Sequence, residues 1–215
     1  MTARSIAVLL SGSGSNLQAV LDAQASGELA GRVALVISDR ADAYGLQRAL
    51  GYGIPCAFVP LPAAPPAERA AARAAWERRL LSVLNAFSYD LVLLSGFMRV
   101  LSAEFLASCR APVINQHPAL LPDPADAAAG RDYVPTSAGA RVPALRGAHV
   151  VAEALRRGLG ATGCTVHYVT PEVDNGPVLA RAEVPIVPGD TEASLHERIK
   201  IAERRMIVEV LARLA

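Results

Sequence analysis

Apolar and polar residues follow one another along the chain in two rhythms, which predict strands and helices in turn. The runs Ile6–Leu10, Val33–Ile37 and Leu91–Leu94 are almost wholly apolar, as expected of strands that are covered on both faces. Between them, apolar positions recur at helical spacing, which predicts parallel strands joined by right-handed crossovers. The expected strands are 6–10, 33–37, 56–60 and 90–95, and the expected helices are about 16–26, 43–51, 67–86 and 102–108.

The second half of the sequence begins with an expected strand at 112–115 and then changes character. Residues 123–145 are rich in Ala, Asp, Gly and Pro without clear periodicity, which predicts a mobile or solvated loop. A strand pair joined by the turn at 174–177 follows, and Thr191 is expected to cap the last helix. The remaining expected elements are a helix near 148–158, strands 164–169 and 178–186, and a helix from 191 to about 214.

This order of elements predicts an α/β fold with a Rossmann-like, doubly wound and mostly parallel sheet, a C-terminal strand pair and a closing helix. The chain has 215 residues, of which 52% are hydrophobic and 19% charged, so a single domain over 1–215 with one core is expected. Within it, residues 1–111 would bind phosphate and residues 112–215 would carry the catalysis. Trp76 lies on an apolar helix stripe and is expected in the core.

Charge and cysteine content narrow the choice of partners. A net charge of +1 with interleaved signs gives no basic footprint for nucleic acid, so the expected partners are small molecules. The three cysteines are scattered, which predicts small thiols in a reducing compartment rather than disulfides or a metal site. No apolar run approaches the ~20 residues of a membrane span, and no signal peptide is evident. A cytoplasmic monomer or homodimer without membrane contact is therefore expected.

The junction after the first strand has the composition of a phosphate site. Gly12 and Gly14 allow the backbone to point successive N–H groups inward, at the positive end of the following helix. Ser15 and Asn16 are expected to cap that helix or to donate to the anion. The order of residues matches neither the dinucleotide fingerprint nor the P-loop, so a monophosphate is the expected ligand. The alternative is an ordinary strand-to-helix turn.

The candidate catalytic residues lie in the run from Asn115 to Pro122. Asn115 and His117 are two positions apart at the end of a strand and therefore project to the same side. An amide donor beside an imidazole can stabilise an oxyanion and relay a proton, which is equipment for acyl transfer. Asp174 is expected near His117, where its charge would raise the pKa of the imidazole above about 6.5. Taken singly, His117 is also consistent with a core histidine and Asp174 with a turn former.

The sequence resembles the folate-dependent formyltransferases nearly from end to end. The pattern Asn-x-His-Pro-x-Leu-Leu-Pro with a downstream Asp is typical of enzymes that use formyltetrahydrofolate, and the start Ser-Gly-x-Gly-Ser-Asn-Leu-Gln is typical of the branch that acts on glycinamide ribonucleotide. The matching segments are 11–18, 42–46, 96–101, 115–122, 163–169 and 174–177.

The resemblance implies formyl transfer from the co-substrate 10-formyltetrahydrofolate to the glycine amine of phosphoribosylglycinamide, a step of purine synthesis, with no metal. The amine would attack the formyl carbon directly, while Asn115 and protonated His117 hold the oxyanion and Asp174 assists proton transfer. The implied ribonucleotide-binding residues are Gly14, Ser15, Asn16, Lys200 and Glu203. The implied folate-binding residues are Arg73, Met98, Arg99, Val100, Leu101, Asn115, Thr170, Pro171, Glu172, Val173 and Asp174.

The chain departs from the family after the catalytic strand. Residues 123–146 stand where the family has only a few residues, an insertion of roughly twenty, and no Pro directly precedes Gly147. The insertion is interpreted as a lid, as a change in access to the cleft, or as inert surface, and inert surface is favoured. His149 is assigned a structural role, and His167 is interpreted as a hydrogen-bonded interior histidine.

Three other functions compete with formyl transfer to the ribonucleotide. A formyltetrahydrofolate deformylase would use the same three side chains on water, but such proteins usually carry a regulatory domain ahead of the first strand, which here begins at Ile6. A methionyl-tRNA formyltransferase needs a further domain and a basic surface for tRNA, and neither is evident in this sequence. The third is a non-catalytic protein that binds a phosphoribosyl metabolite, and the retention of Asn115, His117 and Asp174 speaks against it.

Overall fold

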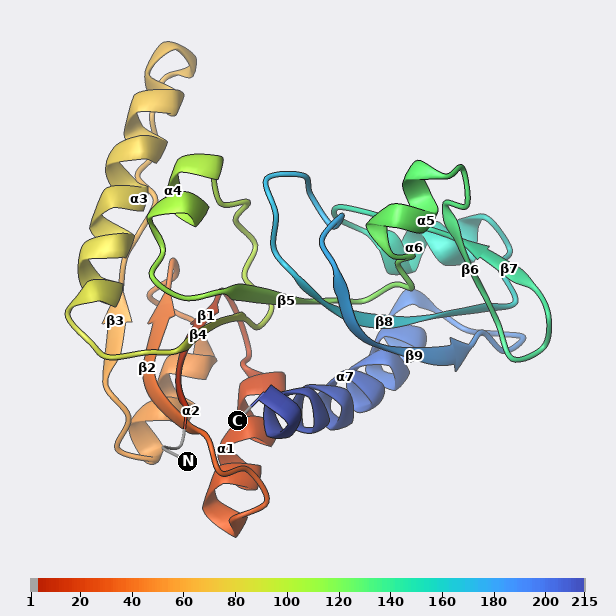
Figure 1. The fold of residues 1–215 in the computed structure, drawn as a ribbon, viewed down its shortest axis with the longest axis horizontal. Coiled ribbons are helices and arrows are strands. Elements are labelled where there is room, and N and C mark those ends of the chain that lie inside the picture. Colours follow the sequence, from red (N-terminus) through yellow and green to blue (C-terminus); the bar gives the residue numbers. More distant parts are fainter. Residues whose placement is uncertain (1–3, 215) are drawn as a thin grey trace. The chain divides into compact units, whose positions relative to one another are not determined.

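Helices and strands alternate along the computed structural model, which describes residues 4–214 (Figure 1). They group into two units, one ending at Val113 and the other running from Ile114 to Leu214. Each unit is described by itself below. The expected single domain over 1–215, with halves at 1–111 and 112–215, stays a prediction.

The first unit is built on four parallel strands in the order β3-β2-β1-β4. Every residue of β1 and β4 is buried, which explains why both run apolar without alternation. The elements of this unit are β1 (Ser5–Leu10), α1 (Ser15–Ser26), β2 (Arg32–Ser38), α2 (Tyr44–Gly51), β3 (Cys56–Phe58), the 3-10 turn η1 (Pro66–Glu68), α3 (Arg69–Asn85), β4 (Leu91–Leu94) and α4 (Ala103–Ser108).

Trp76 of α3 lies in the core, as the helical stripe predicts. Its side chain is fully buried, and its indole N–H donates to the carbonyl of Val59 at 2.9 Å. The ring also stacks on Phe97, with 6.3 Å between the ring centroids. A buried indole needs such a partner for its N–H, so the tryptophan fixes the helix to the loop that follows β3.

The second unit is built on antiparallel pairs, β5 with β8 and β8 with β9. The helix α7 packs against β8 and β9, and Thr191 caps it by accepting the N–H of Ser194 at 3.2 Å, as predicted. The elements are β5 (Val113–His117, which starts on the last residue of the first unit), α5 (Pro124–Ala128), β6 (Tyr133–Pro135), β7 (Arg141–Pro143), α6 (Val150–Arg156), β8 (Ala161–Tyr168), β9 (Val178–Pro185) and α7 (Glu192–Leu214).

The predicted fold class is confirmed. Parallel strands alternate with flanking helices, and a C-terminal antiparallel strand pair with a closing helix completes the chain. The continuous apolar runs marked the buried strands correctly because a strand that is covered on both faces has no polar side.

The prediction of a solvated loop over residues 123–145 was wrong. The segment contains the short helix α5 and the antiparallel pair β6-β7, which are too short to leave a periodic signal in the sequence. Val142 of β7 is 4% exposed and joins a buried cluster with Leu120 and Ala161, against which Val134 also packs. This inserted segment, residues 123–146, therefore contributes to the apolar core of the second unit.

Candidate active site

The turn between β1 and α1 leaves the start of the helix without a side-chain cap. Gly14 is the N-cap residue, with a left-handed φ of 67°, and as a glycine it makes no side-chain cap hydrogen bond. The interpretation of Ser15 and Asn16 as caps was therefore wrong, because the cap position falls one residue earlier. The guanidinium of Arg48 lies beside this loop and donates to the carbonyl of Ser13 at 2.8 Å. Uncapped N–H groups, a helix N-terminus and a cation together suit an anion.

The backbone around Gly14 leaves no room for a side chain. A Cβ built on it would lie 2.6 Å from the Cα of Gly45, at the start of α2. The main chains of the two helix starts are thus in direct contact. Together with the positive φ, this contact explains why the position requires glycine.

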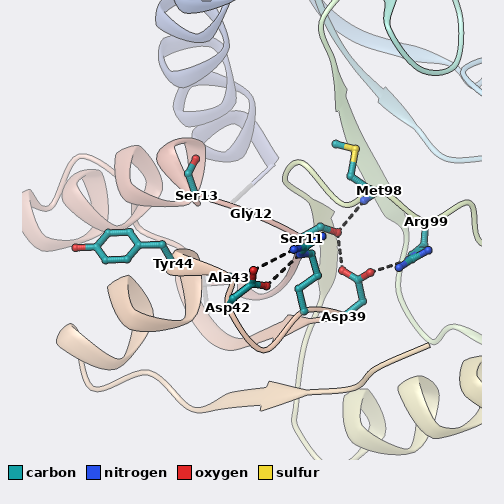
Figure 2. Close-up of a pocket in the computed structure, with 10 residues that line it drawn as sticks. Ser11, Gly12, Ser13, Asp39, Asp42, Ala43, Tyr44, Met98 and Arg99 are labelled. Carbon is teal, nitrogen blue, oxygen red and sulfur yellow. Dashed lines mark hydrogen bonds and ion pairs between the residues drawn. The ribbon is translucent and has the colours of Figure 1, made fainter. Parts of the chain in front are cut away.

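Beside this turn lies a cavity of about 410 Å³, where Ser11, Asp39, Met98 and Arg99 form one hydrogen-bond network (Figure 2). The hydroxyl of Ser11 donates to Asp39 at 2.6 Å and accepts the N–H of Met98 at 2.9 Å. The second carboxylate oxygen of Asp39 accepts from the guanidinium of Arg99, also at 2.6 Å. Asp39 is buried at the carboxyl end of β2, so it ties the segment at 98–99 to the end of β1. Sequence reasoning missed Asp39.

The segment from Met98 to Leu101, expected to line a folate site, divides by exposure. The side chains of Met98 and Val100 are 75% and 53% exposed, whereas Leu101 is buried in the protein. Arg73 of α3, a further expected folate contact, donates to the carbonyl of Val100. The side chain of Leu101 belongs to the core, while the assignment of the segment from Met98 to Leu101 to a folate site stays a prediction.

In the second unit, the three predicted catalytic side chains lie together. Asn115 and His117 project from the end of β5, and Asp174 lies on the connection from β8 to β9 with a left-handed φ of 51°. The amide nitrogen of Asn115 is 3.5 Å from Oδ1 of Asp174, and Nδ1 of His117 is 3.3 Å from Oδ2. The structure thus gathers an amide, an imidazole and a carboxylate within hydrogen-bonding reach, while their roles in catalysis stay predictions.

His167 belongs to the same cluster, a placement that sequence reasoning missed. It stands directly opposite Asn115 in the antiparallel pair of β5 and β8. Its Nδ1 lies 2.8 Å from the carbonyl of Tyr168, so this nitrogen carries the hydrogen of the neutral ring. Its Nε2 then faces the amide nitrogen of Asn115 at 3.3 Å and Oδ1 of Asp174 at 3.5 Å. The interior position was expected, and only the strand register reveals what it faces.

Main-chain groups after β7 complete the cluster. The carbonyl of Leu145 lies 2.7 Å from Nε2 of His117, and because a carbonyl only accepts, this nitrogen carries a hydrogen. The N–H of Gly147 donates to Oδ2 of Asp174 at 2.8 Å. The guanidinium of Arg146, between them, donates to the carbonyl of Asp174 at 3.2 Å. None of these contacts has a signal in the sequence.

Burial reverses one electrostatic expectation. Burial lowers the pKa of His117, and it outweighs the opposing effects of the Asp174 charge and of the Leu145 carbonyl. The nearby carboxylate does raise this pKa, but the prediction that the net value lies above that of a free imidazole was wrong, and the imidazole of the free protein is neutral at pH 7. Burial alone would raise the pKa of Asp174, but the neighbouring side chains of His167 and His117 and the Gly147 N–H together lower it.

The other expected ligand contacts differ in burial and in the partners they contact. Lys200 of α7 is ion-paired with Glu197 at 2.6 Å, while Glu203 is buried and its carbonyl accepts from the amide of Gln116. His149 starts α6 with a left-handed φ of 60° and an exposed side chain. The expected folate-loop residues that are exposed are Pro171, Glu172 and Val173, and the partly buried ones are Thr170 and Asp174.

Residues 4–214 contain neither a cluster of metal-binding side chains nor a helix that could span a membrane. Among these residues, no group of three or more His, Cys, Asp and Glu side chains is placed to hold a metal ion. None of the helices described by the structure is both long and apolar enough to cross a membrane.

Comparison with known proteins identifies relatives across the chain. Residues 4–211 match the family described as formyl transferase. Phosphoribosylglycinamide formyltransferase of Mycobacterium tuberculosis is 38% identical over 210 residues, covering 98% of this chain and 84% of that protein. Trifunctional purine biosynthetic protein adenosine-3 of Drosophila melanogaster is 39% identical over 97% of this chain, which spans only 14% of that protein. Glycinamide ribonucleotide transformylase 1 of Geobacillus kaustophilus superposes with a TM-score of 0.80, at 34% identity, covering 99% and 98% of the two chains.

Proposed function

Because the chain belongs to the formyl transferase family, we propose that it transfers the formyl group of 10-formyltetrahydrofolate to the glycine amine of phosphoribosylglycinamide. The products are N-formylglycinamide ribonucleotide and tetrahydrofolate, in a step of de novo purine synthesis. The observation that carries the proposal is the cluster of Asn115, His117 and Asp174, whose polar atoms lie 3.3 to 3.5 Å apart. The names of the relatives described above support this choice of substrates.

The ribonucleotide phosphate is assigned to the turn before α1. Gly14, Ser15 and Asn16 provide main-chain N–H groups at a helix start that has no side-chain cap, and Arg48 adds a positive charge beside them. Lys200 and Glu203 are assigned to the sugar and amine end, as the family resemblance implies.

The folate co-substrate supplies the formyl group, and the described residues offer both apolar and charged side chains to bind it. Exposed Met98 and Val100 offer apolar contacts to a flat ring. Arg73 offers a cation for an acidic tail, and the loop from Thr170 to Asp174 offers main-chain donors and acceptors. Within the first unit, Met98, Val100 and Arg73 thus suit an amphipathic ligand with one aromatic and one anionic end.

Asn115 stabilises the oxyanion that forms when the amine attacks the formyl carbon. Its amide nitrogen has only long contacts, at 3.5 Å to Asp174 and 3.3 Å to His167, so an oxyanion competes for its hydrogens easily. An oxyanion-hole donor of this kind is typically worth ~10²- to 10³-fold in rate.

His117 and Asp174 accept the proton that the attacking amine must lose and return it to the folate nitrogen that leaves when its bond to the formyl carbon breaks. The imidazole is neutral in the free protein, and its Nδ1 faces the carboxylate that stabilises the ring once it is protonated. A covalent route through Cys164 of β8 is disfavoured, because burial and the Glu203 charge raise the pKa of its thiol to about 12. The amine therefore attacks the formyl group directly.

A spectroscopic assay of folate product release tests the proposal. The purified protein is mixed with 10-formyltetrahydrofolate in the presence and in the absence of phosphoribosylglycinamide. Product that forms only with the ribonucleotide supports the transferase. Product that forms equally without it overturns the proposal in favour of a deformylase, and no product in either mixture, despite ribonucleotide binding, overturns it in favour of a non-catalytic binding protein.

A further inference from the structure

Arg146 bridges the inserted segment and the loop that carries Asp174. Its two terminal nitrogens meet the two carboxylate oxygens of Asp132 at 2.9 and 2.7 Å, a bidentate pair within the inserted segment. The remaining donor, Nε, bonds the main-chain carbonyl of Asp174 at 3.2 Å. A planar guanidinium can satisfy both partners at once, so fixing one side of the fork orients the other.

The residue held by this bridge has a costly backbone conformation. Asp174 has a φ of 51°, and apart from His149 it is the only residue other than glycine with a positive φ in the part of the chain that the structure describes. Such conformations persist where surrounding contacts over-determine them. Here the Gly147 N–H holds the carboxylate and Arg146 holds the carbonyl of the same residue.

The far end of the bridge is firmly anchored. Asp123, at the start of the inserted segment, pairs with Arg181 of β9 at 2.8 Å and accepts the N–H of Val178 at 3.2 Å. Ser137, near its middle, donates to Glu183 through both its N–H and its hydroxyl. With Val142 in the core, the segment is a fixed support for Asp132 rather than the inert surface that was favoured from the sequence.

We propose that Arg146 is a positioning residue of the active site, through which the inserted segment holds Asp174 in the conformation that directs its carboxylate to His117. This inference rests on the proposed function for its kinetic consequence but not for its geometry. It gives the insertion a role in orientation, in contrast to the predicted lid or change of access.

The charge of Arg146 supplies a readout that a purely structural role lacks. The groups that face His117 are Asp174, His167, Arg146 and the Leu145 carbonyl; the Asp174 charge raises the pKa of the imidazole, and its effect is larger than the opposing effect of the Arg146 charge. When the fork is lost and Asp174 leaves His117, the pKa of His117 therefore falls in both variants, and it falls further with lysine, which keeps the opposing charge. A role of Arg146 through its charge alone would instead raise the pKa in the alanine variant. Both substitutions lose the fork that joins Asp132 to Asp174.

The inserted segment contains a matched control. Arg131 makes a similar two-bond pair with Asp126, at 3.1 and 2.7 Å, but touches neither Asp174 nor the cluster. The experiment compares the wild type with Arg146→Ala, Arg146→Lys and Arg131→Ala. The titration of His117 is followed by NMR of the imidazole nitrogens, assigned among the four histidines by single His→Gln variants, and kcat and KM are measured on the same proteins.

The expected result is a lowered His117 pKa in both Arg146 variants, with kcat reduced by up to about 10²-fold in both. The KM for the ribonucleotide is expected to stay within about twofold, and Arg131→Ala is expected to match the wild type. Should Arg146→Ala fold poorly, Arg146→Lys still tests the kcat loss. Wild-type values of kcat and of the His117 pKa in the Arg146 variants overturn the inference. A wild-type protein without formyl transfer, but with the expected pKa change, overturns only the proposed function.

Discussion

Replacing Asp174 by asparagine keeps the shape of the side chain and removes its charge. The side chains of His117 and Asp174 are 4% and 9% exposed, so water screens their interaction poorly. For unit charges 3.3 Å apart, an effective dielectric constant of ~20 gives an attraction of about 5 kcal/mol between the protonated ring and the carboxylate. In the proposed reaction this attraction exists only once His117 has taken up the proton, so its loss raises the barrier rather than weakening binding.

At about 1.4 kcal/mol per factor of ten, the Asp174→Asn variant is expected to lose between about 10³- and 10⁴-fold in kcat. The measurement is steady-state release of the folate product at saturating concentrations of both substrates. Asp126→Asn, which removes an exposed carboxylate from the inserted segment, is the control and should keep wild-type turnover. Thermal denaturation of each variant shows whether the fold is retained.

A folded Asp174→Asn protein with kcat within about threefold of the wild type would refute the reasoning. In that case the carboxylate does not stabilise a proton on His117 during the reaction. A large rise in KM at unchanged kcat would also contradict it, because it would place Asp174 in ground-state binding alone.

Three further predictions follow from other contacts. Gly14→Ala, whose Cβ would meet the main chain of Gly45 at 2.6 Å, should lower the unfolding free energy by at least about 1 kcal/mol and weaken ribonucleotide binding. Gly12→Ala, with open space around it, should do neither. Calorimetry measures both quantities, and equal effects of the two substitutions would contradict the assignment. Because the pKa of His117 is lower in the folded protein, the unfolded chain takes up this proton at a higher pH, so the unfolding free energy should fall as pH drops below about 6.5. In denaturant titrations, His117→Gln should make the unfolding free energy depend less on pH. An unchanged pH dependence counts against a neutral buried ring. Asp39→Asn removes the carboxylate that Arg99 binds, so the KM for the folate should rise several-fold in steady-state assays, and an unchanged value would separate Arg99 from folate binding.

Local patterns predicted most of the fold. Strands such as β1 and β4 are recognisable in the sequence because burial on both faces requires a continuous apolar run. Trp76 was placed in the core by its position on a helical stripe alone. The inserted segment escaped prediction because its helix and strands span only three to five residues, too few for a helical or strand pattern to repeat.

The candidate site was predictable only where its members are close in sequence or match a motif. Asn115 and His117 are two residues apart on one strand, so their common direction follows from strand geometry. His167 reaches the same cluster through the register of β5 and β8, and Arg146 reaches it through the path of its loop. A single sequence reveals neither. The sign of the His117 pKa shift was missed because burial, its dominant cause, is a property of the folded chain.

The contact between Gly14 and Gly45 constrains how this protein can evolve or be redesigned. A Cβ on Gly14 would meet the main chain of Gly45, and a Cβ on Gly45 would meet the side chain of Leu10, so neither glycine can mutate alone to introduce a new recognition group for the ligand. Variation in anion preference must come from neighbouring positions such as the exposed Ser13, whose side chain has room to change. A library randomised at that serine, with both glycines held constant, samples altered ligand selectivity without dismantling the turn.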